Sequence, residues 1–326
     1  MQTTVKKYRI NSEDNFKDPT FESELNNFFS KGNDGFFEGK KGVSIYYNSF
    51  LQKNEAKENG AIVISSGRTE FALKYAEVIY DFFNNGYSVY IIDHRGQGFS
   101  DRIFKQDREL GYVDSFKFYV DDLKSFYDFK ELQKNHKKLF LFGHSMGAAI
   151  STLYLEQFPK DFQAAVLTSP MFGFDFITCK AVKFLKYKFT EYARGKGNYN
   201  YSLEPFSVNT LTNSLVRYNK ILELNEKFPK VKLGGPSYKW VAESCKAMRN
   251  IFKYSYKLSI PIKIFQAEKE KVVSLKAQEK FVTLLEKQGK VVEIIKIPEA
   301  FHELLFEKDS IRKTVIIKIL DYFKYF

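Results

Sequence analysis

The segment Gly143-His144-Ser145-Met146-Gly147 has residue types and spacing that suit nucleophilic chemistry. An apolar run, residues 139–142, precedes it, and apolar residues at helical spacing follow it. A strand that turns sharply into a helix presents its central residue at the tip, and flanking glycines remove Cβ atoms that would collide there. The segment therefore predicts a nucleophilic Ser145. A structural serine in a tight turn is the alternative.

A serine hydroxyl needs a base to take its proton, and histidine is the usual base near neutral pH. The chain has four histidines. His136 lies in a lysine-rich segment and is expected at the surface, His144 is expected to pack within the turn, and His94 follows the end of a strand. When a nucleophile occupies such a turn, the acid and then the histidine follow it in the chain. Only His302 lies after Ser145, so we predict that His302 is the base.

The acid that orients the imidazole is expected just after the strand predicted over residues 260–267, where the sequence offers Glu268 and Glu270. Many such loops follow the pattern Gly-x-x-Asp-x-apolar-Val, which places Ala267 at the glycine and Glu270 at the acid. Glutamate suffices, because the carboxylate only orients the imidazole and stabilises the imidazolium. We predict Glu270 as the acid and keep Glu268 as a second candidate. A solvated surface charge is the alternative for Glu270.

Two backbone N–H groups are expected to stabilise an oxyanion beside Ser145. The N–H of Met146 lies at the predicted helix start, where the helix dipole favours negative charge. The N–H of Arg68 lies in the loop after the strand predicted over residues 61–66, and Gly67 lets that backbone approach a substrate. An ordinary strand-to-helix turn is the alternative for this loop. The chemistry requires no metal or cofactor.

The elements that must position these residues follow a regular alternation of short apolar runs and helical patterns. This alternation predicts an α/β fold with a mostly parallel central sheet and helices on both faces. Residues 35–50 predict a hairpin that opens the sheet. The predicted strands cover residues 61–66, 87–93, 137–143, 164–170, 260–267 and 291–298, and the predicted helices cover 71–86, 118–132, 146–158, 274–288 and 308–324.

The alternation stops after Pro170 and resumes near residue 257. Between these points the chain has helical patterns but no clear buried strand. We therefore expect residues 1–170 and 257–326 to form the core, with residues 171–256 inserted as a helical cap or lid. Such a cap can exclude water and select the substrate.

The net charge of +12 suits nucleic acid or an anionic membrane surface, although a lysine-rich composition alone accounts for it equally well. The chain shows no motif typical of nucleic-acid binding, so we expect no such partner. Residues 176–200 carry six basic residues and one acidic residue. On a helix their apolar residues fall on one side, which suggests peripheral contact with an anionic membrane, whereas a cap helix with a solvated lysine face is the alternative.

Two cysteines, Cys179 and Cys245, are too few for a disulfide framework and lack metal-binding spacing. We expect both to remain reduced, which favours a cytoplasmic protein. The N-terminal residues contain no apolar segment of the kind that a signal peptide needs. No stretch reaches the roughly 18 apolar residues expected of a membrane span. The sequence makes no prediction of the oligomeric state.

Several segments resemble one family of α/β-hydrolases, the group that includes monoacylglycerol lipases and bacterial lysophospholipases and is also called the serine aminopeptidase family. The resemblance covers roughly residues 35–322. It implies an α/β-hydrolase fold with a cap, a Ser145–Glu270–His302 triad and acyl-ester hydrolysis, and it implies that His94 and Arg95 belong to a structural loop. The segments are GHSMG, DHRGQGFSDR (93–102), LTNSLVRYNK (211–220), GGPSYKWVAES (234–244), TSPMFG (168–173), QAEKEKVV and FHELLFEKD.

The chain departs from the family pattern at two places. Ser66-Gly67 stands where the family usually has His-Gly, and Glu270 stands where it usually has Asp. The segments TSPMFG, QAEKEKVV and FHELLFEKD are most similar to the lysophospholipase branch. The resemblance therefore implies a serine hydrolase that cleaves the acyl ester of lysophospholipids or monoacylglycerols.

Other activities fit the same residues. An esterase, a thioesterase or a peptidase would use the same triad, and a non-catalytic lipid-binding module of the same fold is a further alternative. Trp240 and Phe172 are candidate substrate-binding residues, although packing within the cap accounts for Trp240 equally well.

Overall fold

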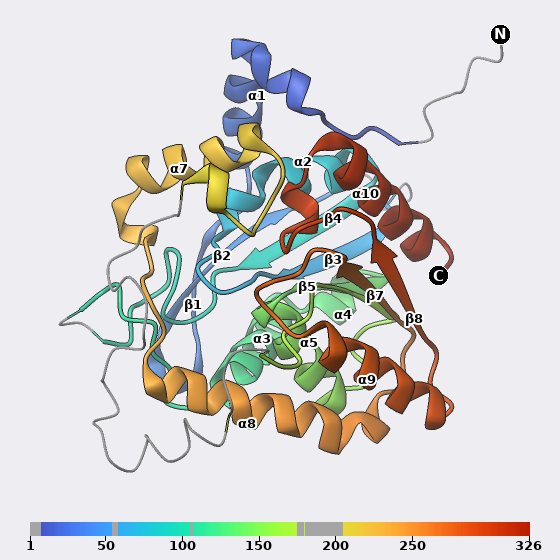
Figure 1. Cartoon of the computed structure of the whole chain (residues 1–326). Helices are drawn as coiled ribbons and strands as arrows, with labels where there is room; N and C mark the ends of the chain where they lie inside the picture. The colour runs from blue at the N-terminus through green and yellow to red at the C-terminus, as the bar shows by residue number, and fades with distance from the viewer. Residues whose placement is uncertain (1–7, 54–57, 105–106, 175–178, 180–204) are drawn as a thin grey trace, which may run out of the picture.

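A mostly parallel sheet runs through the chain (Figure 1). The computed structural model describes residues 8–53, 58–104, 107–174, 179 and 205–326. Within them the strand order is β1-β2-β4-β3-β5-β6-β7-β8. The strands are β1 (Gly35–Glu38), β2 (Ser44–Phe50), β3 (Gly60–Ser65), β4 (Tyr87–Ile92), β5 (Leu139–His144), β6 (Ala164–Thr168), β7 (Ile262–Ala267) and β8 (Val292–Ile297).

The hairpin and the parallel sheet predicted from the sequence are both confirmed. Strands β1 and β2 pair antiparallel, as do β2 and β4, and every later pair in the sheet is parallel. Strands β3, β4, β5 and β6 are buried along their whole length. Continuous Val, Ile, Leu and Phe runs suit this position, because helices cover both faces of a parallel sheet.

Helices form a layer on each face of the sheet (Figure 1). The helices α1 (Pro19–Ser30), α2 (Ala76–Asn84) and α10 (Asp309–Lys324) bury apolar residues in one cluster. The helices α3 (Lys117–Phe129), α5 (Met146–Gln157), α8 (Tyr238–Tyr254) and α9 (Leu275–Lys287) bury theirs in the other. The remaining described helices are α4 (Leu132–Asn135) and α7 (Leu215–Lys227), with 3-10 turns between elements.

Helix α1 is absent from the sequence prediction, which begins its elements at residue 35. The Asp18 side chain caps the helix by accepting a 2.9 Å hydrogen bond from the Thr20 N–H. Three apolar residues four positions apart, Phe21, Leu25 and Phe29, are buried. An Asp-Pro start followed by this spacing is a helix signal that the sequence does contain.

The described part of the predicted cap contains α7 and α8. The Ser237 side chain begins α8 by accepting a 3.1 Å hydrogen bond from the Trp240 N–H. Helix α8 buries one face in the same apolar cluster as α5, and α7 lies near α1 (Figure 1). The division into core and cap stays a prediction. The basic segment 176–200 lies outside the described residues, except for Cys179.

The expectation that both cysteines stay reduced is wrong. Cys179 and Cys245 form a disulfide, with their Cα atoms 5.7 Å apart and the two residues 66 positions apart in the chain. A count of cysteines cannot predict this pairing, because only the fold decides which distant residues come within bonding distance. The argument for a cytoplasmic protein from reduced cysteines therefore no longer holds.

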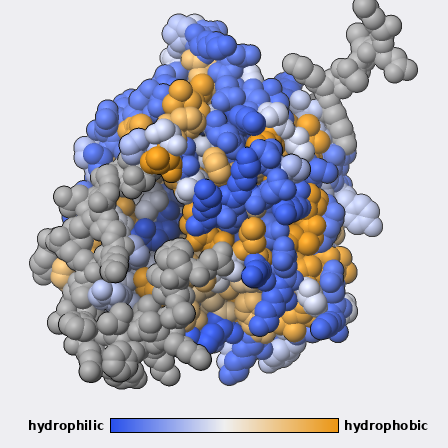
Figure 2. Space-filling view, in the orientation of Figure 1, coloured by the Kyte–Doolittle hydropathy of each residue, from blue (hydrophilic) through white to orange (hydrophobic). Residues whose placement is uncertain are grey.

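The visible surface mixes hydrophilic and hydrophobic residues, with the hydrophilic ones spread over most of the face shown in Figure 2. None of the helices in the described ranges has the length and the apolar character needed to cross a membrane.

Candidate active site

Ser145 lies at a strained turn between β5 and α5. Its backbone has φ 51° and ψ −114°, a conformation that L-residues rarely adopt. A Cβ added at Gly143 would lie 2.7 Å from the Ala148 Cα, and one added at Gly147 would lie 2.0 Å from the Ser65 carbonyl oxygen. Both glycines are therefore required by close packing, as the sequence pattern predicts.

The structure brings together the three side chains that the sequence pattern selects. The Ser145 Oγ lies 2.9 Å from the His302 Nε2, and the His302 Nδ1 lies 2.7 Å from the Glu270 Oε2. All three residues are buried. They come from the end of β5 and from the loops after β7 and β8, which meet because the carboxyl ends of parallel strands share one edge of the sheet.

Of the two candidate acids, Glu270 is the one that reaches the imidazole. Its second oxygen, Oε1, accepts hydrogen bonds from the N–H groups of Val272 at 2.8 Å and Val273 at 3.3 Å. These bonds fix the carboxylate in its loop. Glu268 instead accepts a 3.0 Å hydrogen bond from the Glu299 N–H at the surface.

Burial and charge pairing act in opposite directions on this pair. Burial alone would raise the pKa of Glu270, but His302 and the two backbone N–H groups hold that pKa below its ordinary value. Burial alone would lower the pKa of His302, but Glu270 beside it raises that pKa above the ordinary value, with smaller contributions from Glu303 and Glu70. The arrangement thus favours a carboxylate beside an imidazole that accepts a proton readily.

The loop after β3 lies against the first turn of α5. The Gly67 N–H donates to a carboxylate oxygen of Glu70, and the Gly67 carbonyl accepts a 2.8 Å hydrogen bond from the Gln97 side chain. Within the described residues, the backbone N–H groups of Arg68 and Met146 have no hydrogen-bond partner. These two groups are therefore free to donate to a bound substrate.

The loop after β4 has a structural role, as the resemblance implies. His94 is buried, and its Nε2 lies 2.9 Å from the Ser65 Oγ. Burial lowers the pKa of His94 to about 3, so it stays neutral. Arg95 forms a buried ion pair with Asp122 at 2.6 Å. This loop supports the chain on which Gly67 lies.

The other two histidines also have structural contacts. His144 is buried, as predicted, and its ring lies 4.9 Å from the His302 ring, centre to centre. The prediction that His136 lies at the surface is wrong. Its side chain is only 6% exposed and lies 2.7 Å from the Tyr90 hydroxyl and 3.0 Å from Glu58. Neighbouring lysines indicate an exposed segment, but the ring turns inward to these partners.

A buried charge network behind His302 was not predicted from the sequence. The Lys74 Nζ lies 2.8 Å from Glu70 and 2.7 Å from Glu303, the residue after His302. Glu70 also accepts a 2.6 Å hydrogen bond from the Tyr75 hydroxyl. The four-residue spacing of Glu70 and Lys74 is a helix-type pair signal, but no local signal indicates Glu303 as their partner.

The two candidate substrate-binding residues are both buried. Phe172 packs on Phe281 of α9 with ring centres 4.5 Å apart. Trp240 donates a 3.2 Å hydrogen bond from its Nε1 to the Tyr119 hydroxyl. Their contact with a substrate stays a prediction.

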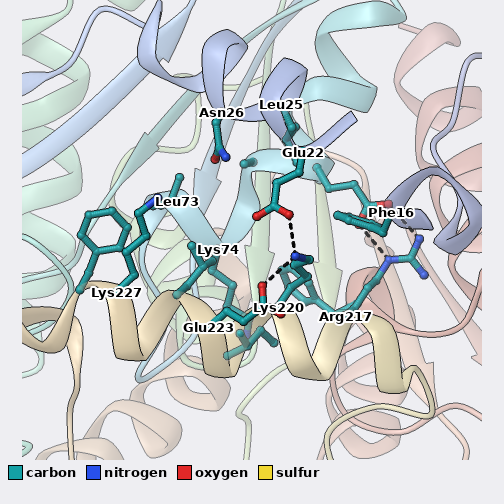
Figure 3. Close-up of a pocket in the computed structure, with 16 residues that line it drawn as sticks. Phe16, Glu22, Leu25, Asn26, Leu73, Lys74, Arg217, Lys220, Glu223 and Lys227 are labelled. Atoms are coloured by element: carbon teal, nitrogen blue, oxygen red, sulfur yellow. Dashed lines mark hydrogen bonds and ion pairs between the residues drawn. The ribbon is translucent and has the colours of Figure 1, made fainter. Parts of the chain in front are cut away.

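A cavity of roughly 170 Å³ lies between α1 and α7, and none of the residues of the triad lines it. Figure 3 shows Lys220 at this cavity, paired with Glu22 at 2.8 Å and with Glu223 at 2.7 Å. Lys74 lines the cavity as well. Lys74 therefore connects the cavity to the network beside His302.

Within the described ranges, no group of three or more His, Cys, Asp or Glu side chains is arranged to hold a metal ion.

The sheet order, the strained serine and the position of the histidine loop define an α/β-hydrolase. Residues 56–309 match the family described as serine aminopeptidase, S33. The chain belongs to this family.

Two kinds of relative support this placement. Lysophospholipase L2 of Escherichia coli K12 is 34% identical over 311 residues, which cover 92% of this chain and 89% of that protein. The human monoglyceride lipase is 24% identical over 261 residues, which cover 79% of this chain and 80% of that protein. The chain is accordingly a carboxylic ester hydrolase.

Solved structures confirm the fold. A soluble variant of monoglyceride lipase from Saccharomyces cerevisiae aligns with a TM-score of 0.71 at 19% identity, covering 89% of this chain and 94% of that one. The monoacylglycerol lipase of Paleococcus ferrophilus aligns with a TM-score of 0.66 at 20% identity, covering 86% and 98%. The α/β-hydrolase fold expected from the sequence is therefore confirmed.

Proposed function

We propose that this enzyme hydrolyses the acyl ester of lysophospholipids or monoacylglycerols, with Ser145 as nucleophile, His302 as base and Glu270 as acid. The observation that carries the proposal is the continuous hydrogen-bonded chain from Glu270 through His302 to Ser145 in a buried site. The substrate class is supported by the relatives, which are named lysophospholipase and monoglyceride lipase.

The reaction follows from this geometry. His302 Nε2 takes the proton of the Ser145 hydroxyl as its oxygen attacks the ester carbonyl. The N–H groups of Arg68 and Met146 donate to the resulting oxyanion. Glu270 keeps the imidazole oriented and stabilises the imidazolium. The alcohol leaves with the proton from His302, and a water molecule activated by the same imidazole then releases the fatty acid.

Residues 171–256 are proposed to form the cap over this site, with Trp240 and Phe172 close to the acyl chain. The basic segment 176–200 is proposed to rest on anionic lipid at a membrane surface. Co-sedimentation with vesicles that contain anionic lipid, but not with neutral vesicles, is the expected result. Equal binding to both would remove the membrane proposal and leave the reaction unaffected.

A peptidase is the second candidate function, because the family that matches residues 56–309 is described as serine aminopeptidase. It would use the same three side chains. The lipid esterase and the peptidase can be distinguished by comparing hydrolysis rates for four substrates: lysophospholipids, monoacylglycerols, short p-nitrophenyl esters and aminoacyl amides. A strong preference for aminoacyl amides would replace the lipid ester proposal.

A fluorophosphonate probe tests the nucleophile directly. We expect the parent protein to be labelled and Ser145→Ala to be unlabelled with its fold retained. Unchanged labelling of Ser145→Ala would contradict the assignment of the nucleophile, and an unlabelled parent would favour a non-catalytic module.

A further inference from the structure

Arg68 carries a guanidinium for which the proposed reaction has no use. Its Nη2 donates a hydrogen bond to the Gly234 carbonyl, and the guanidinium carbon lies 5.3 Å from the centre of the Trp240 ring. A Cβ added at Gly111 would lie 2.4 Å from the Arg68 Nη2, so this glycine leaves room for the group. The guanidinium therefore lies between the loop after β3 and the start of α8.

The charge on this guanidinium is not neutralised by any carboxylate in the described part of the chain. The Arg68 Nε is buried without a hydrogen-bond partner. Burial lowers the pKa of Arg68 to about 10, and the interaction with Tyr119 opposes this shift. A cation that is partly withdrawn from water and has no carboxylate partner is less stable than a paired one. An anionic ligand would therefore be stabilised here.

The loop that carries Arg68 packs beside the turn at Ser145, which suggests which anion this would be. The loop that carries Arg68 lies directly on the start of α5, since a Cβ at Gly147 would meet the Ser65 carbonyl oxygen at 2.0 Å. In a lysophospholipid, a glycerol unit separates the ester from the phosphate, and its length is comparable to that of an arginine side chain. Guanidinium groups bind phosphate through paired, charge-assisted hydrogen bonds.

We propose that the Arg68 side chain binds the phosphate of a lysophospholipid while Ser145 attacks its ester. This residue thereby favours lysophospholipids over monoacylglycerols, which lack the phosphate. The inference rests on the proposed function, namely that the site hydrolyses these esters.

Arg102 provides a matched control, because its side chain contacts the same segment, residues 230–234, as that of Arg68. It is buried, and its Nη2 donates hydrogen bonds to the carbonyls of Lys230 at 2.7 Å and Lys232 at 3.3 Å. Burial also lowers the pKa of Arg102 to about 10. It extends, however, from the loop after β4 and not from the loop that carries Arg68. A purely structural role in holding the cap would make the two arginines equivalent.

The experiment compares kcat/KM for lysophosphatidylcholine and for a monoacylglycerol with the same acyl chain, both in the same neutral detergent micelles. We expect Arg68→Met to lower the ratio of kcat/KM for lysophosphatidylcholine to kcat/KM for the monoacylglycerol by about 10- to 100-fold. A loss of this size is typical of removing one charge-assisted hydrogen bond. Arg68→Lys is expected to lower it by a smaller factor, and Arg102→Met to leave it within about 2-fold. Circular dichroism establishes whether each variant folds. If Arg68→Met does not fold, the ratio measured for Arg68→Lys decides the test.

Two results would overturn the inference. The first is a ratio that stays constant in both Arg68 variants, or that falls equally in Arg102→Met. The second is that millimolar inorganic phosphate stabilises the parent but not Arg68→Met, while the substrate ratio is the same in both proteins. Arg68 would then bind a free anion and not the phosphate of the substrate. A parent that hydrolyses neither ester would instead contradict the proposed function itself.

Discussion

The ammonium of Lys74 lies 2.7 Å from the carboxylate of Glu303, the residue that follows His302. The same ammonium lies 2.8 Å from Glu70, which also accepts a hydrogen bond from the Gly67 N–H. One buried lysine therefore ties the loop of the proposed base to the loop that carries a proposed oxyanion donor.

Removing this lysine should destabilise the fold strongly. Lys74→Met leaves Glu70 and Glu303 buried without a counter-charge, so we expect a loss of about 3 to 5 kcal/mol in the free energy of unfolding, measured with urea. Lys220→Met is the matched control at the same cavity. Its partners Glu22 and Glu223 are exposed, so the expected loss is below about 1 kcal/mol. Equal losses in the two variants would contradict the role of the buried network.

The two candidate acids can be separated by one pair of substitutions. Glu270→Gln removes the charge that orients His302 and stabilises its imidazolium, so we expect kcat to fall by about 10²- to 10⁴-fold. Glu268→Gln should keep kcat within about 3-fold, because Glu268 lies at the surface and does not contact His302. Steady-state hydrolysis of a chromogenic ester is sufficient, and a larger effect at Glu268 would reverse the assignment.

The pH dependence of the reaction should report the raised pKa of His302. Only neutral imidazole can act as the base, so kcat/KM should fall as the pH falls through a pKa above the ordinary value of about 6.5. Glu270→Gln removes the largest cause of the upward shift, and the midpoint should move to lower pH in that variant. A midpoint that is the same in both proteins would mean that Glu270 does not set it.

Glu156 in α5 should cost stability at neutral pH. It is buried, its Oε1 has no hydrogen-bond partner in the described part of the chain, and burial raises its pKa to about 9. The unfolded glutamate ionises near pH 4.3, so the unfolded state alone loses its proton between about pH 4.3 and 9 and stability falls across that window.

Glu156→Gln should therefore raise the free energy of unfolding by about 1 to 3 kcal/mol at pH 7. The difference from the parent should shrink toward pH 4, where both states of the parent are protonated. Urea titrations at the two pH values measure it. A variant that is less stable than the parent at pH 7 would show that the carboxyl is ionised in the folded protein.

The disulfide between Cys179 and Cys245 should stabilise the chain by about 2 to 4 kcal/mol, because it closes a long loop. The non-reduced protein should show no free thiol after unfolding. A reductant should lower the melting temperature of the parent but leave that of Cys245→Ser unchanged. Two reactive thiols in the unfolded, non-reduced protein would exclude the bond.

The sequence by itself determined the strands and the order in which the proposed nucleophile, acid and base follow one another along the chain. Buried parallel strands need continuous apolar runs, so residues 139–142 and their counterparts were visible without coordinates. The turn at Ser145 was equally visible, because two close backbone approaches there exclude any residue but glycine. The requirement at Gly143 arises within the turn, from Ala148, whereas the one at Gly147 comes from Ser65 on β3. The apolar run and the glycine pattern are nevertheless local in the sequence, so both can be recognised from residue types alone.

Only the tertiary structure decided which distant groups meet. It placed Glu270 rather than Glu268 beside His302, paired Cys179 with Cys245, and placed Glu303 beside Lys74. These contacts join residues far apart in the sequence, and their formation depends on the three-dimensional path of the loops. The type of a residue determines which groups it can bind. The packing of the sheet and its helices determines whether such a group lies within bonding distance.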